Sequence, residues 1–274
     1  MASPSRLPVF PTLMLALRFV WDGRLGFWYT AFLPVLVLTV LNTLGAALAV
    51  PVDPANPAAG SFAPDFIVVL ANLALLALYV MFAVAWHRRW LMPNESVTYA
   101  TALKWDGRKT KFLVRLFLIA ACAFAVMLPI FIFFQLIGLG AGPEGVIAPG
   151  TVLGAVLMVL CGYAVMGRLM PLLPAAAVDD SLDFRGCWAM TSGVTGRLML
   201  IVLLPGLIFG ALNLAAEAGI DALAAGTGLS GSLVAVAIEA FGLQIVAFFG
   251  IAVGVTALSI SYQSLKQTLP APPD

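Results

Sequence analysis

Six long apolar runs constrain the fold of this chain more than any other feature. Each run contains at most one charged residue and has about the 20 residues that a helix needs to cross a hydrocarbon core of about 30 Å. In lipid a helix also satisfies all of its own backbone hydrogen bonds. The runs predict membrane spans at Phe27–Val50, Phe66–Trp86, Phe112–Ile137, Thr151–Leu173, Leu198–Ala215 and Leu233–Ile260.

Composition agrees with a membrane protein and excludes several other classes. Hydrophobic residues make up 62% of the chain and charged residues 10%, whereas a soluble domain carries about 25% charged residues. The net charge is +1 and there is a single His, so nothing supports a nucleic-acid partner. We therefore expect an all-α polytopic membrane protein, with residues 1–274 forming one integral membrane domain and the first span retained rather than cleaved.

The distribution of charge predicts the orientation. All 14 Lys and Arg residues lie near the termini or in and beside the connections after the second and fourth spans. The other connections carry only acidic residues, at Asp53, Asp65, Glu144, Glu217 and Asp221. The positive-inside rule then places both termini in the cytoplasm. All six Trp residues fall on the same side, where we expect each indole N–H at the headgroups.

A repeated tetrapeptide suggests a repeated unit. Trp-Asp-Gly-Arg occurs at Trp21–Arg24 and at Trp105–Arg108, and a related Val-Thr-Gly-Arg ends at Arg197. Each follows an amphipathic stretch that predicts a short helix in the cytoplasmic interface, capped in the second and third cases by Asn94 and Ser181. We expect the Gly of each junction to adopt a left-handed turn.

Two interpretations of these junctions stay open. Either the chain is a triplication of "interfacial helix plus two spans", with units at residues 8–86, 94–173 and 181–262, or any junction between an interfacial helix and a span has this chemistry. In both cases the Arg holds its charge at the phosphates while its stem lies on apolar surface.

Charged residues inside or beside spans are the candidate site residues, because they are costly there. Six arginines could bind phospholipid headgroups or only enforce orientation: Arg88, Arg89, Arg108, Arg115, Arg168 and Arg197. Beside Arg168, Pro171 and Pro174 remove backbone donors and could leave a small polar recess. Glu239, in the sixth span, is either a proton or cation site or, as we favour, a carboxyl hydrogen-bonded to a neighbouring helix.

Nothing in the sequence predicts catalysis, a cofactor or a metal. His87 stands without a second ligand or a nucleophile at recognisable spacing, so we expect interfacial hydrogen bonding. The cysteines Cys122, Cys161 and Cys187 form no C-x-x-C pair. Five amides within spans are expected to join helices rather than bind substrate; they are Asn42, Asn72, Gln135, Asn213 and Gln244.

One segment resembles a known group of proteins. The stretch GRLMPLLPAAAVDDSLDFRGCWAMTSGVTGRLML, starting at Gly167, is similar to uncharacterised six-span YciC-like bacterial inner-membrane proteins and to the membrane domains fused to some glycerophosphodiester phosphodiesterases. AVAWHRRWLMPNE, starting at Ala83, is similar to alphaproteobacterial members. The resemblance implies a bacterial inner-membrane location and a membrane-domain role for Arg168, Pro174, Trp188, Thr191 and Gly193. Where the group has Asn after this Gly, this chain has Val194.

Together these features predict a non-enzymatic membrane protein. It would interact with lipid, with anionic phospholipids as partners, or would serve as a scaffold or subunit with a membrane-protein partner. The alternative is a transporter or channel for a small solute or ion.

Overall fold

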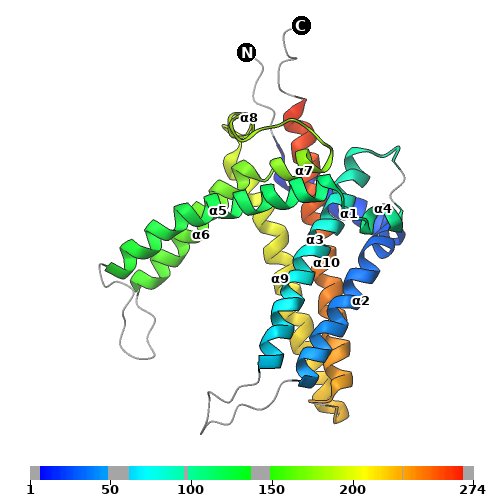
Figure 1. Ribbon diagram of the computed structural model, residues 1–274. Coiled ribbons are helices and arrows are strands. Elements are labelled where there is room, and N and C mark those ends of the chain that lie inside the picture. Colours follow the sequence, from blue (N-terminus) through cyan, green and yellow to red (C-terminus); the bar gives the residue numbers. More distant parts are fainter. Residues whose placement is uncertain (1–6, 49–61, 96–97, 137–148, 230, 268–274) are drawn as a thin grey trace.

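The computed structural model describes residues 7–48, 62–95, 98–136, 149–229 and 231–267, and every regular element in this part is a helix (Figure 1). In chain order the helices are α1 (Val9–Asp22), α2 (Arg24–Leu48), α3 (Phe62–Leu91), α4 (Tyr99–Leu103), α5 (Gly107–Leu136), α6 (Pro149–Leu169), α7 (Leu172–Ala177), α8 (Phe184–Met190), α9 (Thr195–Thr227) and α10 (Leu233–Lys266).

Six stretches are long and apolar enough to cross a membrane, as the sequence predicts. They are α2, α3, α5, α6 with α7, α9 and α10. The predicted span ends at Val50 and Ile137 lie outside the described residues. The protein is therefore a multi-pass membrane protein. The fifth span is longer than predicted, because α9 continues to Thr227 and ends on the left-handed Gly228 (φ 73°). Glu217 and Asp221 consequently lie on this helix and not in a connection.

Helix α10 is the centre of a bundle that also contains α2, α3 and α9. The most apolar stretch of α10 is 56% buried inside the protein, whereas the most apolar stretch of α5 is 11% buried. This difference arises because α10 packs against α1, α2, α3 and α9 together. In lipid the exposed apolar faces of the outer helices are solvated by acyl chains, so they need no protein partner.

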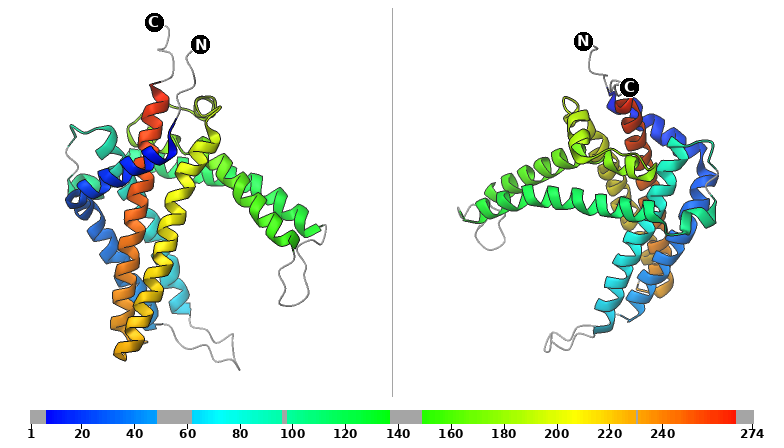
Figure 2. Two further views of the ribbon diagram at one scale, coloured as in Figure 1. Left: turned by 180° about the vertical axis from the view of Figure 1, so that it is seen from behind. Right: turned by 45° about the horizontal axis from the view of Figure 1, so that its top comes forward.

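The α5–α6 hairpin leaves this bundle at an angle (Figures 1 and 2). Within the hairpin, small residues let the helices approach closely. A Cβ added at Gly154 would lie 2.9 Å from the ring of Phe134, and one at Gly162 would lie 2.8 Å from Sδ of Met127. The hairpin joins the bundle near one end, where a Cβ at Gly167 would lie 2.9 Å from the backbone nitrogen of Met199 in α9.

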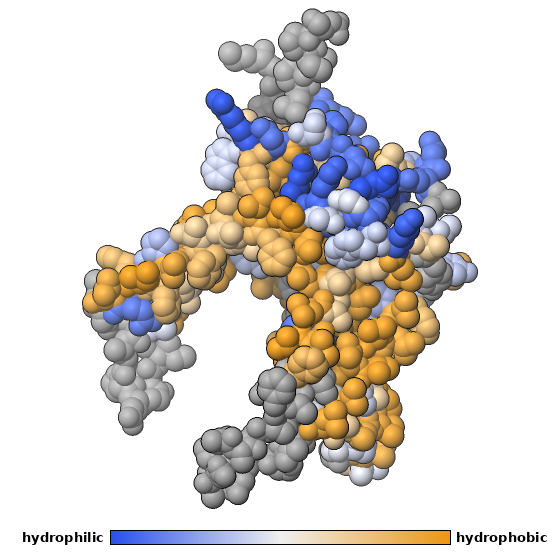
Figure 3. All heavy atoms as spheres, viewed as in Figure 1, coloured by the Kyte–Doolittle hydropathy of each residue, from blue (hydrophilic) through white to orange (hydrophobic). Residues whose placement is uncertain are grey.

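The short helices α1, α4, α7 and α8 gather at the end of the molecule that carries the start of α1 and the end of α10 (Figure 2). We call this the basic end. Hydrophilic side chains collect there, and hydrophobic ones cover most of the long helices (Figure 3). Short helices are thus confirmed in the three predicted places. Helix α7 is a further one, formed where the predicted fourth span breaks at Pro171.

The predicted caps of two short helices are wrong. Helix α4 is capped by Thr98, which forms a reciprocal capping box with Thr101, because Asn94 lies in the turn that closes α3. Helix α8 is capped by Asp183, whose Oδ1 accepts from the Gly186 N–H at 2.7 Å. Asp183 lies two residues after Ser181, directly before the helix.

The sequence predicts a left-handed glycine at each of the three junctions, and the structure has one at only one of them. Gly193 has φ 84°, whereas Gly23 has φ −84° between α1 and α2. Gly107 is the first residue of α5. Asp106 caps this helix, because its Oδ1 accepts a hydrogen bond from the backbone N–H of Lys109 at 3.1 Å. The two copies of Trp-Asp-Gly-Arg therefore form different junctions. The triplication stays a prediction, and each proposed unit supplies one helical hairpin.

Candidate functional site

Two of the six predicted headgroup arginines are bound by carboxylates. Arg88 is 11% exposed, pairs with Glu95 and donates to the Ala177 carbonyl at 2.9 Å. Arg108 donates from Nε to Oδ2 of Asp179 at 2.6 Å. Both side chains therefore join separate elements at the basic end.

Arg89, Arg115 and Arg168 also contact protein groups. The Arg89 guanidinium lies 5.3 Å from the Trp86 ring centroid and fills the space beside Gly26, where an added Cβ would lie 1.6 Å from Nη1. Arg115 donates to the carbonyls of Leu172 at 2.9 Å and Leu182 at 3.1 Å. Arg89 therefore packs between α3 and α2, and Arg115 joins α5 to the start of α7 and to the segment before α8.

Arg168 lies at the proline break, where the sequence predicts a polar recess. Its guanidinium stacks on Trp188, 3.9 Å from the ring centroid, and donates to the Trp188 carbonyl at 3.0 Å. The carbonyl of Arg168, freed by the break, accepts from Sγ of Cys187 and Oγ1 of Thr191, each at 3.2 Å. The freed backbone is thus satisfied by side chains of α8 and its C-terminal turn.

Arg197 differs from the other five. Its side chain is exposed in the first turn of α9, and the described residues offer it no hydrogen bond or ion pair. Arg185, on the neighbouring α8, is exposed as well. Of the predicted set, Arg197 is the side chain most available to a headgroup.

The polar residues within spans lie in separate places. Glu239 is half-buried on α10. Asn42, Asn72 and Gln244 border a cavity of about 250 Å³ between α2, α3 and α10, and Nδ2 of Asn72 donates to the Val68 carbonyl of its own helix at 2.8 Å. Their expected role in joining helices stays a prediction. Gln135 is exposed near the end of α5. Asn213 borders a different and larger cavity, which the sequence does not predict.

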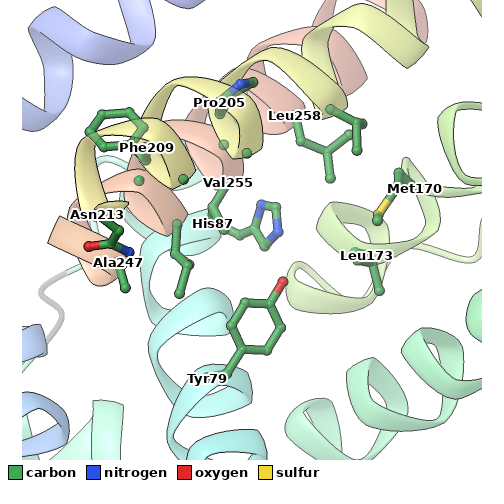
Figure 4. A pocket seen from close by; sticks show the side chains of 16 residues that line it. Tyr79, His87, Met170, Leu173, Pro205, Phe209, Asn213, Ala247, Val255 and Leu258 are labelled. Carbon is green, nitrogen blue, oxygen red and sulfur yellow. The ribbon is translucent and has the colours of Figure 1, made fainter. Parts of the chain in front are cut away.

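This larger cavity measures about 360 Å³ and lies between α3, α9, α10 and the turn that leads into α7 (Figure 4). Most of its lining is aliphatic or aromatic, and its polar side chains are Tyr79, His87 and Asn213. None of the lining residues is charged. We call it the lateral cavity, because no residue of α2 or α5 lines it.

Glycines create the space in the lateral cavity. Gly206 and Gly210 of α9 line it, and a Cβ at either position would meet no atom within 4 Å. On α10, Gly250 also lines the cavity but receives the Phe209 ring, whose atoms lie 2.7 Å from an added Cβ. One glycine pair on α9 therefore leaves room, while Gly250 lets the two helices approach.

His87 forms part of a row of hydrogen bonds between α3 and α10. Its Nδ1 lies 2.7 Å from Oγ of Ser259, beside a 2.8 Å bond from Nε1 of Trp86 to Oγ1 of Thr256. Both indole and imidazole are buried, at 0% and 1% exposure. This corrects the expected position of Trp86 N–H at the headgroups, and moves His87 from the interface into the bundle.

The remaining chemistry of the described residues is limited. They contain no group of three His, Cys, Asp or Glu side chains placed to hold a metal ion. Burial is the main cause that raises the pKa of the Cys187 thiol to about 12, so this buried cysteine stays protonated at neutral pH. A signal for the lateral cavity does exist in the sequence, since Gly206/Gly210 and Gly250/Gly254 are each a G-x-x-x-G pair on a span.

No protein-family model matches this chain, and no match was found among curated proteins or solved structures.

Proposed function

We propose that this protein is a non-enzymatic lipid-binding protein of the bacterial inner membrane, with both termini in the cytoplasm. A lipid chain occupies the lateral cavity, and the basic end contacts anionic phospholipid headgroups. The observation that carries the proposal is the cavity itself: it is apolar, about 360 Å³ in volume, and lies among helices long enough to span a membrane.

The shape of the cavity suits an extended chain. Its lining runs from Val202 to Asn213 on α9 and from Ala247 to Leu258 on α10. Each stretch covers about 16 Å along a helix axis at about 1.5 Å per residue. A volume of this size lies within the range of about 300–1,000 Å³ that is usual for small-molecule sites. An acyl chain is the ligand of this shape that a bilayer supplies in excess.

The lining chemistry favours lipid over the alternative of an ion or charged-solute transporter. Such a path needs charged or multiple polar groups near mid-membrane, and the lateral cavity has no charged side chain. Glu239, the acid within α10, is not among the lining residues. A chain that enters from the side leaves its headgroup near the basic end, where exposed Arg197 and Arg185 favour anionic neighbours.

The resemblance of the Gly167–Leu200 segment to YciC-like inner-membrane proteins supports the location and the membrane-domain role. In the proposal, Arg168, Trp188 and Thr191 hold α8 against the broken end of α6, because all three take part in the contacts between these elements. These contacts stabilise the segment from the end of α6 into α7, where Met170 and Leu173 line the cavity. A membrane-protein partner that uses the assembly as a scaffold is compatible with this role.

Native mass spectrometry of the purified full chain tests the proposal. Gly210→Leu fills the cavity without meeting a neighbouring atom at Cβ, so co-purified lipid should fall severalfold. Gly219→Leu is the matched control, since it is on the same helix, equally free of neighbours, and outside the cavity. Equal lipid occupancy in both variants would remove the cavity as the binding site. Arg197→Ala should lower only the share of anionic lipid among the co-purified lipids and leave the total amount unchanged.

A further inference from the structure

The hydrogen-bonding groups of the lateral cavity indicate which lipid it accepts, and the inference rests on the lipid-binding function proposed above. Three polar side chains line the cavity, and none of them is charged. A phosphate placed among them would lose its hydration without gaining a cation, which is a large cost in a low-dielectric site. The ligand group inside the cavity is therefore uncharged.

The hydrogen bonds around His87 define what the imidazole offers. Ser259 has one hydroxyl hydrogen, and it donates this hydrogen to the Val255 carbonyl at 2.9 Å. Ser259 must then accept from His87, so Nδ1 carries the hydrogen in their 2.7 Å bond. Thr256 repeats this arrangement, because it donates to the Ala252 carbonyl and accepts from Trp86.

The second imidazole nitrogen is consequently an acceptor. His87 is 1% exposed, and an unpaired charge is costly at such burial, so the neutral ring with a lone pair on Nε2 is the favoured form. No described residue donates a hydrogen bond to Nε2. Because His87 lines the cavity, a buried acceptor is left for a ligand that brings a donor.

Tyr79 supplies a complementary group from the same helix. Its side chain and the His87 ring extend into the same space (Figure 4), and its hydroxyl has no hydrogen-bond partner among the described residues. A phenol both donates and accepts. One ligand hydroxyl between the two side chains can donate to Nε2 of His87 and accept from the Tyr79 O–H, whereas an ester or ether oxygen can only accept.

We propose that the lateral cavity binds an uncharged lipid with a free hydroxyl group, of the diacylglycerol type, with the hydroxyl between Tyr79 and His87 and one acyl chain extending along the apolar lining of α9 and α10. His87 is four residues from the basic end of α3 and Tyr79 is twelve residues from it. The chain then points away from the basic end. The second acyl chain remains in the surrounding lipid.

A matched pair of lipids tests this inference on the full chain in detergent. The probes are 1,2-dioleoylglycerol and 1,2-dioleoyl-3-acetylglycerol, which differ in whether the hydroxyl is free. A buried hydrogen-bond acceptor left unpaired favours the free alcohol by about tenfold in retained lipid. Tyr79→Phe removes a donor that a hydroxyl and an ester oxygen can both use, so it should lower retention of both lipids and keep the preference for the free alcohol. Tyr163→Phe, on α6 and outside the cavity, should leave retention of both lipids unchanged.

His87→Asn provides an independent variant, because an Asn amide can keep a donor near Nδ1 while the acceptor at Nε2 is lost. It should therefore abolish the preference for the free alcohol. Equal retention of the two lipids by the wild type, with both lost in Gly210→Leu, would overturn the hydroxyl inference and leave the lipid-binding function intact. If Gly210→Leu does not reduce retention of either lipid, the lipid-binding function proposed for the cavity is overturned, and the hydroxyl inference falls with it.

Discussion

Arg108 donates from Nε to Oδ2 of Asp179 across 2.6 Å, and this bond ties the start of α5 to the turn after α7. Lys111 reaches the other carboxylate oxygen at 3.3 Å. Arg108 belongs to the second copy of Trp-Asp-Gly-Arg. In the first copy, the corresponding Arg24 is exposed, and among the described residues its one hydrogen bond goes to the Trp21 carbonyl in the preceding helix, at 3.5 Å. The same four residues thus serve different connections.

Asp179→Asn should lower stability modestly and remove part of its pH dependence. Burial acts to raise the pKa of Asp179, but hydrogen bonds and charge from Arg108 and Lys111 outweigh it, so the pKa is below its ordinary value. The stabilisation is therefore present above the unfolded pKa and lost as pH falls through the folded one. Because the side chain is 40% exposed, we expect about 0.2–1 kcal/mol.

The measurement is thermal unfolding in detergent between pH 3 and pH 7, buffer values chosen to bracket an ordinary Asp pKa of about 3.9. Asn is the suitable replacement because residue 179 has φ 57°, a conformation that Asn tolerates. The gap between the wild type and Asp179→Asn should narrow toward low pH. A gap that stays constant over the whole range would contradict the assigned ion pairs.

Alanine at the glycine of each Trp-Asp-Gly-Arg copy should have opposite effects. A Cβ at Gly23 would lie 2.8 Å from the Phe19 carbonyl oxygen, whereas one at Gly107 would meet nothing within 4 Å. Gly23→Ala should destabilise by about 1–3 kcal/mol. Gly107→Ala should be neutral or stabilise by up to about 1 kcal/mol, from helix propensity. Equal melting shifts for the two variants would show that the junctions are equivalent after all.

Trp86 and Thr256 should be energetically coupled. Their hydrogen bond is 2.8 Å long and buried, so a double-mutant cycle with Trp86→Phe and Thr256→Val should give about 0.5–1.5 kcal/mol. The comparison pair is Trp90 and Gln263, whose 3.2 Å bond is exposed, and a smaller coupling is expected there. Unfolding in a detergent titration provides the free energies. A coupling near zero for Trp86 and Thr256 would contradict the contact between α3 and α10.

Cys187 should resist alkylation in the folded protein. Burial, the largest cause, raises the pKa of its thiol to about 12, and the thiolate is the reactive form. In a background with Cys122→Ala and Cys161→Ala, N-ethylmaleimide at pH 7.5 should label Cys187 only after unfolding. Labelling of the folded chain at the rate of a free thiol would mean that α8 does not pack against the end of α6.

The secondary structure was largely predictable because its signals are local. Six apolar runs became six long helices. The amphipathic stretches predicted short helices before the first, third and fifth spans, and these are α1, α4 and α8. Errors fell at boundaries. The cap moved from Asn94 to Thr98 because Thr101 could reciprocate the hydrogen bond, and α9 continued past Ala215 because no residue before Gly228 ended it.

The sequence by itself determined that this chain belongs in a bilayer, since hydropathy summed over about 20 residues decides between lipid and water. Only the tertiary structure decided the partners of individual side chains. Arg88 and Arg108 are neutralised by Glu95 and Asp179, and His87 meets Ser259, 172 residues away. The lateral cavity likewise needs four elements brought together. Such contacts depend on how distant helices pack, and hydropathy along one helix carries no information about that packing.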